Sequence, residues 1–227
     1  MNATPGLTLD QVIDYMIKNN INDARIYEYL TLPADITAIN ACLASIDQID
    51  GQPKPNGMKK KTWEGQKNQQ KGACFEQLTG LVLQTVKPFK SWDKVHTTTN
   101  EIDWLIQMGP TALHLPTMRE WGTHCLCECK IGNESVNVTW IGKLNTLLQT
   151  SGASVGLLIS RKGIPTKGSS SARFQLQLLA AQTPSRVIIS IDLEEMKESV
   201  QNRRFLQLIS TRFIEVKTGA GALQAIA

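Results

Sequence analysis

The sequence predicts an α/β fold with a central mixed β-sheet flanked by helices and preceded by a small helical N-terminal lobe. From Gly72 onward, short apolar strand patterns alternate with stretches of helical periodicity, which is typical of α/β domains. Residues 1–50 carry helical patterns alone. The 227 residues suffice for one domain of about 150 residues plus an appendage. We therefore divide the chain into a lobe (1–50), a linker (51–71) and a main domain (72–227).

The predicted lobe begins with an amphipathic helix that Thr8 is placed to cap. Two shorter helices are expected at 23–31 and 35–48, with Pro33 between them. Seven acids against two cations give residues 1–50 a net charge of −5, which disfavours a DNA-binding helix-turn-helix. We expect a packing or oligomerisation lobe. The first helix shows its apolar spacing at Leu9, Val12, Ile13, Met16 and Ile17.

The predicted linker is strongly basic. The stretch "DGQPKPNGMKKKTWEGQKNQQKG" has two prolines, four glycines and no apolar period, which favours a linker or loop. Its six lysines against one glutamate give residues 51–71 a net charge of +5. Lys59, Lys60 and Lys61 are candidates for contacts to nucleic-acid phosphates, although such a run is also typical of a solvated surface.

The main domain shows alternating helix and strand signals. Helices are predicted at about 72–86 and 138–149, and strands near 101–108 and 124–131. After these come the strand "SVGLLIS", the helix "ARFQLQLLAAQ", the strand "RVIISID" and a C-terminal helix.

The strand at 124–131 places two charged side chains together. Because side chains alternate across a strand, Glu128 and Lys130 point from one face, about 7 Å apart along the strand. The opposite face is predicted to be apolar core. It carries Cys125, Cys127, Cys129 and Ile131. A zinc site on these cysteines is disfavoured, because alternate residues of a strand lie too far apart for one tetrahedral ion.

The strand "EIDWLIQM" carries a second buried acid, Asp103. Burying an acid in an apolar strand costs several kcal/mol unless it is paired or binds a cation. If this strand forms a hairpin with 124–131, Asp103 approaches Glu128, and two converging carboxylates suit Mg²⁺, for which Mn²⁺ could substitute. The alternative is that both acids form structural ion pairs with Lys130 or with arginines. One strand face is expected to hold Ile102, Trp104, Ile106 and Met108, and the other Glu101, Asp103 and Leu105.

This arrangement resembles the PD-(D/E)xK nuclease signature. "EID" supplies the first acid, and 25 residues later "ECK" supplies Glu128 and Lys130. The order of "GACFEQLTG", the two strands, a helix and "GASVGLLISRKG" is similar to the Mrr-like restriction endonuclease branch over about residues 69–197. Unlike the family pattern, no proline precedes Asp103.

The resemblance implies a restriction-endonuclease-like fold and a Mg²⁺-dependent DNA endonuclease of restriction or phage-defence type. It implies metal binding by Asp103 and Glu128, with assistance from Glu76 and the carbonyl of Cys129, and a catalytic role for Lys130. The alternatives are a structure-specific repair or recombination nuclease and a non-catalytic nucleic-acid-binding or scaffold protein. Further candidates for phosphate contacts are Lys143, Arg161 and Lys162.

The expected partners are DNA and either a second copy of the chain or another subunit of a multi-component system. No apolar run approaches the roughly 20 residues that span a bilayer, and the N-terminus lacks a secretory pattern. Five cysteines, three of them at alternate positions, do not favour a disulfide framework. We therefore expect a cytoplasmic location.

Overall fold

The computed structural model describes residues 8–20, 23–96, 101–132, 134–165 and 171–219. Its sheet has the strand order β1-β2-β3-β4-β5. Neighbouring strands are antiparallel from β1 to β3 and parallel from β3 to β5, so the predicted α/β fold with a mixed sheet is confirmed. The strands are β1 (Phe89–His96), β2 (Glu101–Met108), β3 (His124–Lys130), β4 (Val155–Ser160) and β5 (Val187–Asp192).

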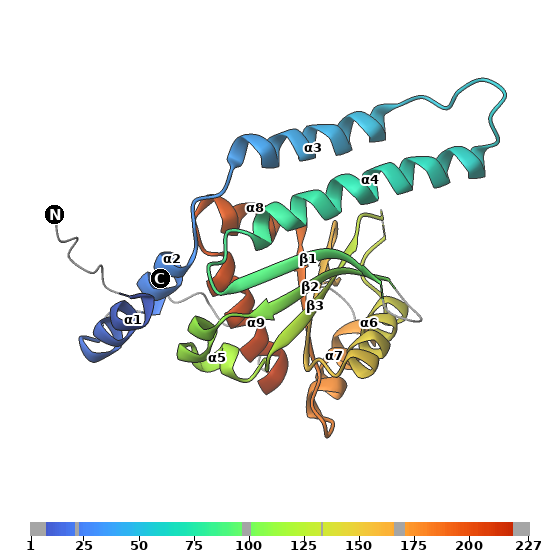
Figure 1. The fold of residues 1–227 in the computed structure, drawn as a ribbon. Coiled ribbons are helices and arrows are strands. Elements are labelled where there is room, and N and C mark those ends of the chain that lie inside the picture. Colours follow the sequence, from blue (N-terminus) through green and yellow to red (C-terminus); the bar gives the residue numbers. More distant parts are fainter. Residues whose placement is uncertain (1–7, 21–22, 97–100, 133, 166–170, 220–227) are drawn as a thin grey trace.

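Helices cover both faces of the sheet (Figure 1). One face packs against α4 (Lys60–Leu83), α8 (Leu193–Gln201) and α9 (Phe205–Thr218). The other packs against α6 (Val138–Ser151) and α7 (Ser171–Ala181). Because side chains alternate along β3 and β4, neighbouring apolar residues serve opposite cores. The first core therefore holds Cys127 and Leu157, and the second holds Leu126 and Leu158.

The N-terminal helices are α1 (Leu9–Lys18), α2 (Asp23–Leu30) and α3 (Ile36–Gly51). Thr8 caps α1 as predicted, through a capping box with Gln11. Residues of all three helices belong to the hydrophobic cluster that also contains the first sheet face: Met16, Ile26, Leu30, Ile39, Cys42 and Ile46. The predicted lobe therefore packs as part of the main core. The loop before β3 contains a 3₁₀ turn (Pro110–His114) and α5 (Pro116–Arg119).

The predicted linker is wrong over most of its length. Only 52–59 lie between helices, because α4 begins at Lys60 and runs for 24 residues. Its first half packs alongside α3 and extends past the sheet (Figure 1), so it has no large apolar stripe to reveal it in the sequence. Gly65 and Gly72 further weaken the helical signal, because glycine is a poor helix former.

β1 was not predicted, because polar residues dominate it and most of its residues are exposed or half-buried. It pairs with β2 in a hairpin that is irregular in the middle. Asp93 is paired with Trp104 and Val95 with Ile102, whereas Lys94, between them, has a positive φ of 46°. Within the described ranges, no helix is both long and apolar enough to cross a membrane.

The irregularity changes which face of β2 meets which core. Trp104 and Ile106 pack in the core beneath α4, but Ile102 packs in the core beneath α6 and α7. The prediction that Ile102 shares a face with Trp104 is therefore wrong. Asp103 lies at the point where the two faces exchange.

Candidate active site

The two predicted acids meet where β2 and β3 separate. The β2–β3 register runs from Gln107 opposite His124 to Trp104 opposite Cys127. One residue beyond that last pair, the Asp103 carboxylate joins the two strands, because its Oδ2 accepts a hydrogen bond of 2.7 Å from the Cys129 backbone N–H. Asp103 thus lies beside the "ECK" segment, as the hairpin prediction required.

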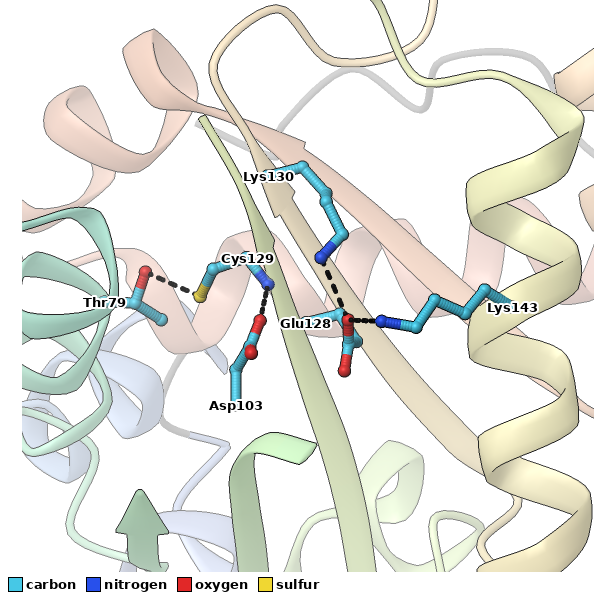
Figure 2. A network of polar contacts seen from close by, with 6 residues as sticks. All are labelled: Thr79, Asp103, Glu128, Cys129, Lys130 and Lys143. Carbon is cyan, nitrogen blue, oxygen red and sulfur yellow. Dashed lines mark hydrogen bonds and ion pairs between the residues drawn. The ribbon is translucent and has the colours of Figure 1, made fainter. Parts of the chain in front are cut away.

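Glu128 is the most deeply buried acid of the site, with 2% of its surface exposed. Its Oε2 accepts hydrogen bonds from Lys130 Nζ at 3.1 Å and from Lys143 Nζ at 3.5 Å (Figure 2). Its Oε1 is also buried but has no hydrogen-bond partner among the described residues. A buried acceptor without a donor costs about 1–3 kcal/mol, and more for a charged group. The site therefore holds a carboxylate oxygen that a cation would satisfy.

The electrostatics of Asp103 favour a cation as well. Burial raises the pKa of Asp103, and the nearby charge of Glu128 raises it further. The Cys129 N–H, Lys130 and Lys143 oppose this rise in pKa without cancelling it. A divalent ion bound between the two carboxylates would remove the repulsion that the Glu128 charge exerts on Asp103.

Glu76, on α4, faces the same group of acids. Burial raises the pKa of Glu76 and the charge of Asp103 raises it further, while Lys94, 4.0 Å away, opposes the rise. Glu76 is therefore within electrostatic reach of the Asp103 side of the site. Its metal-assisting role stays a prediction, as does that of the Cys129 carbonyl.

Lys130 is held on two sides. Its Nζ lies 3.1 Å from Glu128 and 4.8 Å from the centre of the Trp140 ring. Trp140 and Lys143 both come from the start of α6, where the Asn137 side chain accepts hydrogen bonds from the backbone N–H groups of residues 139 and 140. The helix cap thus helps to position one cation and the ring that contacts the other.

Two contacts fix α4 against the strands of the site. The Cys129 thiol donates to Thr79 Oγ1 at 3.3 Å (Figure 2). At Gly80, an added Cβ would lie 2.5 Å from ring atoms of Trp104, so only glycine allows α4 to approach this closely. Glu76 lies about one turn earlier on the same helix. In the sequence, the signal for this contact is a glycine within the apolar part of a predicted helix.

The residues present fit a magnesium ion, which binds through one or two carboxylates and keeps several waters. Asp103 and Glu128 provide those carboxylates, and Glu128 Oε1 is an acceptor without a donor. In the described part of the chain, no three His, Cys, Asp or Glu side chains gather closely enough to hold a metal ion together. The geometry therefore supports a site of two acids rather than a closed cage of protein ligands.

The residues that were predicted to contact phosphates lie in different parts of the structure. Lys143 joins the site through Glu128. Arg161 instead pairs with Asp50 of α3 at 2.6 Å, and Lys162 is exposed beyond β4. The run at Lys59, Lys60 and Lys61 lies at the start of α4, exposed and away from the two acids.

Asp50 was missed by the sequence analysis, although it connects three elements. Its carboxylate accepts from Lys71 of α4 at 2.8 Å and from Arg161 after β4 at 2.6 Å. Burial acts to raise the pKa of Asp50, but the two cations outweigh it and hold the pKa below its usual value. No local pattern around Asp50 distinguishes it from the other acids of the N-terminal helices.

The resemblance to PD-(D/E)xK nucleases is a prediction from the sequence motif. No protein-family model, no curated protein and no solved structure matches this chain significantly.

Proposed function

We propose that this chain is a Mg²⁺-dependent DNA endonuclease of restriction or phage-defence type, with a restriction-endonuclease-like core. One observation carries the proposal: among the described residues, nothing donates to the buried Glu128 Oε1 near Asp103, while Lys130 and Lys143 both contact the other oxygen of Glu128. A purely structural ion-pair cluster would be expected to pair both oxygens of so buried an acid.

Asp103 and Glu128 are the residues that would hold Mg²⁺, or Mn²⁺ in its place. When bound there, the ion supplies positive charge that polarises the phosphoryl group and lowers the pKa of a coordinated water. The hydrogen bond from the Cys129 N–H fixes one Asp103 oxygen, so the orientation of that carboxylate is set before any ligand binds.

Lys130 is the residue best placed to act on the nucleophile. Its ammonium group lies on the Glu128 face of the strand, and the Trp140 ring restricts its movement. In this position it orients the attacking water and stabilises negative charge that develops on the phosphate. Lys143 is more exposed than Lys130 and is suited to a contact with a phosphate oxygen.

The direct test is cleavage of plasmid DNA with Mg²⁺ and with EDTA. We expect Asp103→Asn and Glu128→Gln to lower the cleavage rate at least about 100-fold, because each removes a charge that a divalent ion needs. Lys130→Ala is expected to lose turnover while its DNA affinity stays close to that of the unchanged chain. Thermal unfolding checks that each variant is folded.

Matched controls are Asp47→Asn and Glu198→Gln, which make the same chemical changes at exposed positions of α3 and α8. They should cleave at the unchanged rate. Full cleavage by the Asp103 or Glu128 variant would contradict the site. DNA binding without any metal-dependent cleavage would instead favour a non-catalytic binding protein.

A further inference from the structure

The first half of α4 extends beyond the sheet as an arm, which we define as Lys60–Gln70. All buried residues of α4 lie after it: Lys71, Phe75, Leu78, Thr79, Gly80, Val82 and Leu83. Within the arm, only Trp63 and Lys67 are even half-buried. Eleven helical residues span about 16 Å, so the arm is long enough to contact a macromolecule bound at the site.

One face of the arm is covered by α3. Lys67 Nζ donates to the Asp50 carbonyl at 2.8 Å, and Lys71, one turn later, donates to the Asp50 carboxylate. The 3.6-residue period therefore places Gly65 and Gln69 of the arm, and Gly72 just after it, on the opposite face of α4, which we call the underside.

The underside leads directly to the candidate active site. The same helix face continues through Glu76 to Thr79 and Gly80, which contact Cys129 and Trp104 of the sheet. Glu76 thus lies on this face of α4, between the arm and the contacts that Thr79 and Gly80 make with the sheet. A ligand against the underside would reach the acids of the site without leaving α4.

The underside is open. A Cβ added at Gly65 or at Gly72 would meet no atom of the described residues within 4 Å. Each glycine inside a helix costs about 1 kcal/mol relative to alanine, and the packing of the described chain does not require either one. Gln66 and Gln69 are exposed beside them and present amide groups that can donate and accept hydrogen bonds. Glycine permits another backbone to approach closely, so these positions suit a bound partner.

The charge of the arm indicates what that partner is. Lys59, Lys60 and Lys61 stand at the helix N-terminus, where the helix dipole adds further positive potential. Glu64 is the single acid of the arm and it is paired with Lys60 at 3.7 Å. The N-terminal end of the arm is therefore complementary to a polyanion.

Its side chains favour a duplex over a single strand. Single strands are held largely by stacking on aromatic rings. The one aromatic residue of the arm, Trp63, lies towards α3, one turn before Lys67 and in contact with its ammonium group. Lysines and amides are the groups that contact phosphates and base edges of double-stranded DNA.

From these observations we propose that the underside of the arm holds double-stranded DNA and guides it to the active site. The duplex backbone passes close to Gly65 and Gly72, and Gln66 and Gln69 hydrogen-bond to its phosphates or base edges. This assignment of the DNA-holding surface rests on the proposed function, but its test reads binding and not cleavage.

The test measures the affinity of the Glu128→Gln chain for a fluorescein-labelled DNA duplex and for one of its single strands, in EDTA. Adding Gln66→Glu and Gln69→Glu should weaken duplex binding by about tenfold or more, because two new charges repel the backbone and amide donors are lost. The matched control adds Gln177→Glu and Gln182→Glu, which make the same change of charge at exposed positions in and just after α7. The control should bind the duplex as tightly as its parent.

Gly65→Ala and Gly72→Ala give a second, independent reading. Both should raise the stability to urea, because alanine favours the helix and its Cβ meets open space. Both should nevertheless lose duplex affinity. A variant that folds better yet binds more weakly cannot owe the loss to a damaged fold.

Three outcomes would overturn the inference: no difference between the two glutamate pairs, unchanged affinity in both alanine variants, or tighter binding of the single strand than of the duplex. If the unchanged chain cleaves DNA and the underside variants bind normally, the inference fails and the proposed function stands. If duplex binding depends on the underside but no metal-dependent cleavage occurs, the proposed function fails and the surface assignment stands.

Discussion

The two halves of α4 belong to one continuous helix but pack against different neighbours. The second half, from Lys71 to Leu83, packs on the sheet and is largely buried. The arm, from Lys60 to Gln70, packs along α3 and is mostly exposed. Gly80, in the second half, accommodates the Trp104 ring, whereas a Cβ at Gly65, in the arm, would meet none of the described atoms within 4 Å. Packing therefore requires a glycine at position 80 and not at position 65.

Lys71 marks the boundary between the halves. It is 4% exposed and its ammonium group is paired with Asp50, which also binds Arg161. The Arg161 backbone N–H in turn donates to the Lys130 carbonyl at 3.0 Å. Asp50 thus connects the base of the arm to the end of β3 that carries Lys130.

The largest difference between the halves is expected when a lysine is lost from each. Lys71→Met removes the buried partner of Asp50 and should lower the free energy of unfolding by about 3 kcal/mol. Lys60→Met breaks an exposed ion pair with Glu64, in which the Lys60 side chain is 83% exposed. This change should alter the free energy of unfolding by less than about 1 kcal/mol. Urea unfolding of both variants measures the difference. Equal effects would mean that the Asp50 network does not anchor the arm.

A second difference is expected between Gly80 and Gly65. Gly80→Ala forces a Cβ to within 2.5 Å of the Trp104 ring, and such overpacking costs about 1–3 kcal/mol. Because Trp104 adjoins Asp103, the variant should also cleave DNA more slowly. Gly65→Ala should not damage the fold and should stabilise it by about 1 kcal/mol. If Gly80→Ala proved as stable as Gly65→Ala, α4 would not be held by this contact.

The smallest effects concern the pH dependence of stability, in which Asp50, at the base of the arm, and Asp103, in the site, are expected to differ. The folded-state pKa of Asp50 lies below its unfolded value. Its ionised form therefore stabilises the fold at neutral pH, and this contribution is lost as the pH falls from the unfolded pKa, near 4, through the folded pKa. Asp50→Asn should flatten the acid side of the stability curve.

Asp103 has the opposite sign, because its pKa is raised in the folded state. Its ionisation destabilises the fold as the pH rises through the two pKa values, so Asp103→Asn should be the more stable chain at neutral pH in EDTA. Adding Mg²⁺ should stabilise the unchanged chain and leave this variant nearly unaffected. Unfolding curves between about pH 3 and pH 7 test both signs. A loss of neutral-pH stability in Asp103→Asn would contradict the description of the site.

The pairing of Asp103 with the Glu128 segment could be predicted because it depends on local rules. Alternation along β3 placed Glu128 and Lys130 on one face, and an antiparallel hairpin brought Asp103 to them. The helical arm could not be predicted from periodicity. Its helix is stabilised by α3 and by the lysine contacts to Asp50, and these depend on residues distant in the chain.

The sequence by itself determined the α/β class, the strands that carry Asp103 and Glu128, and the apolar face of cysteines. These follow from the side-chain periods of 2 residues in strands and 3.6 residues in helices, which can be recognised in a short segment alone. Only the tertiary structure decided that Arg161 pairs with Asp50, that β2 exchanges faces at Asp103, and that α4 contacts the strands of the site through Thr79 and Gly80. Each of these depends on which distant segments pack together, because an ion pair or a packing contact contributes to stability only when both of its residues are in place.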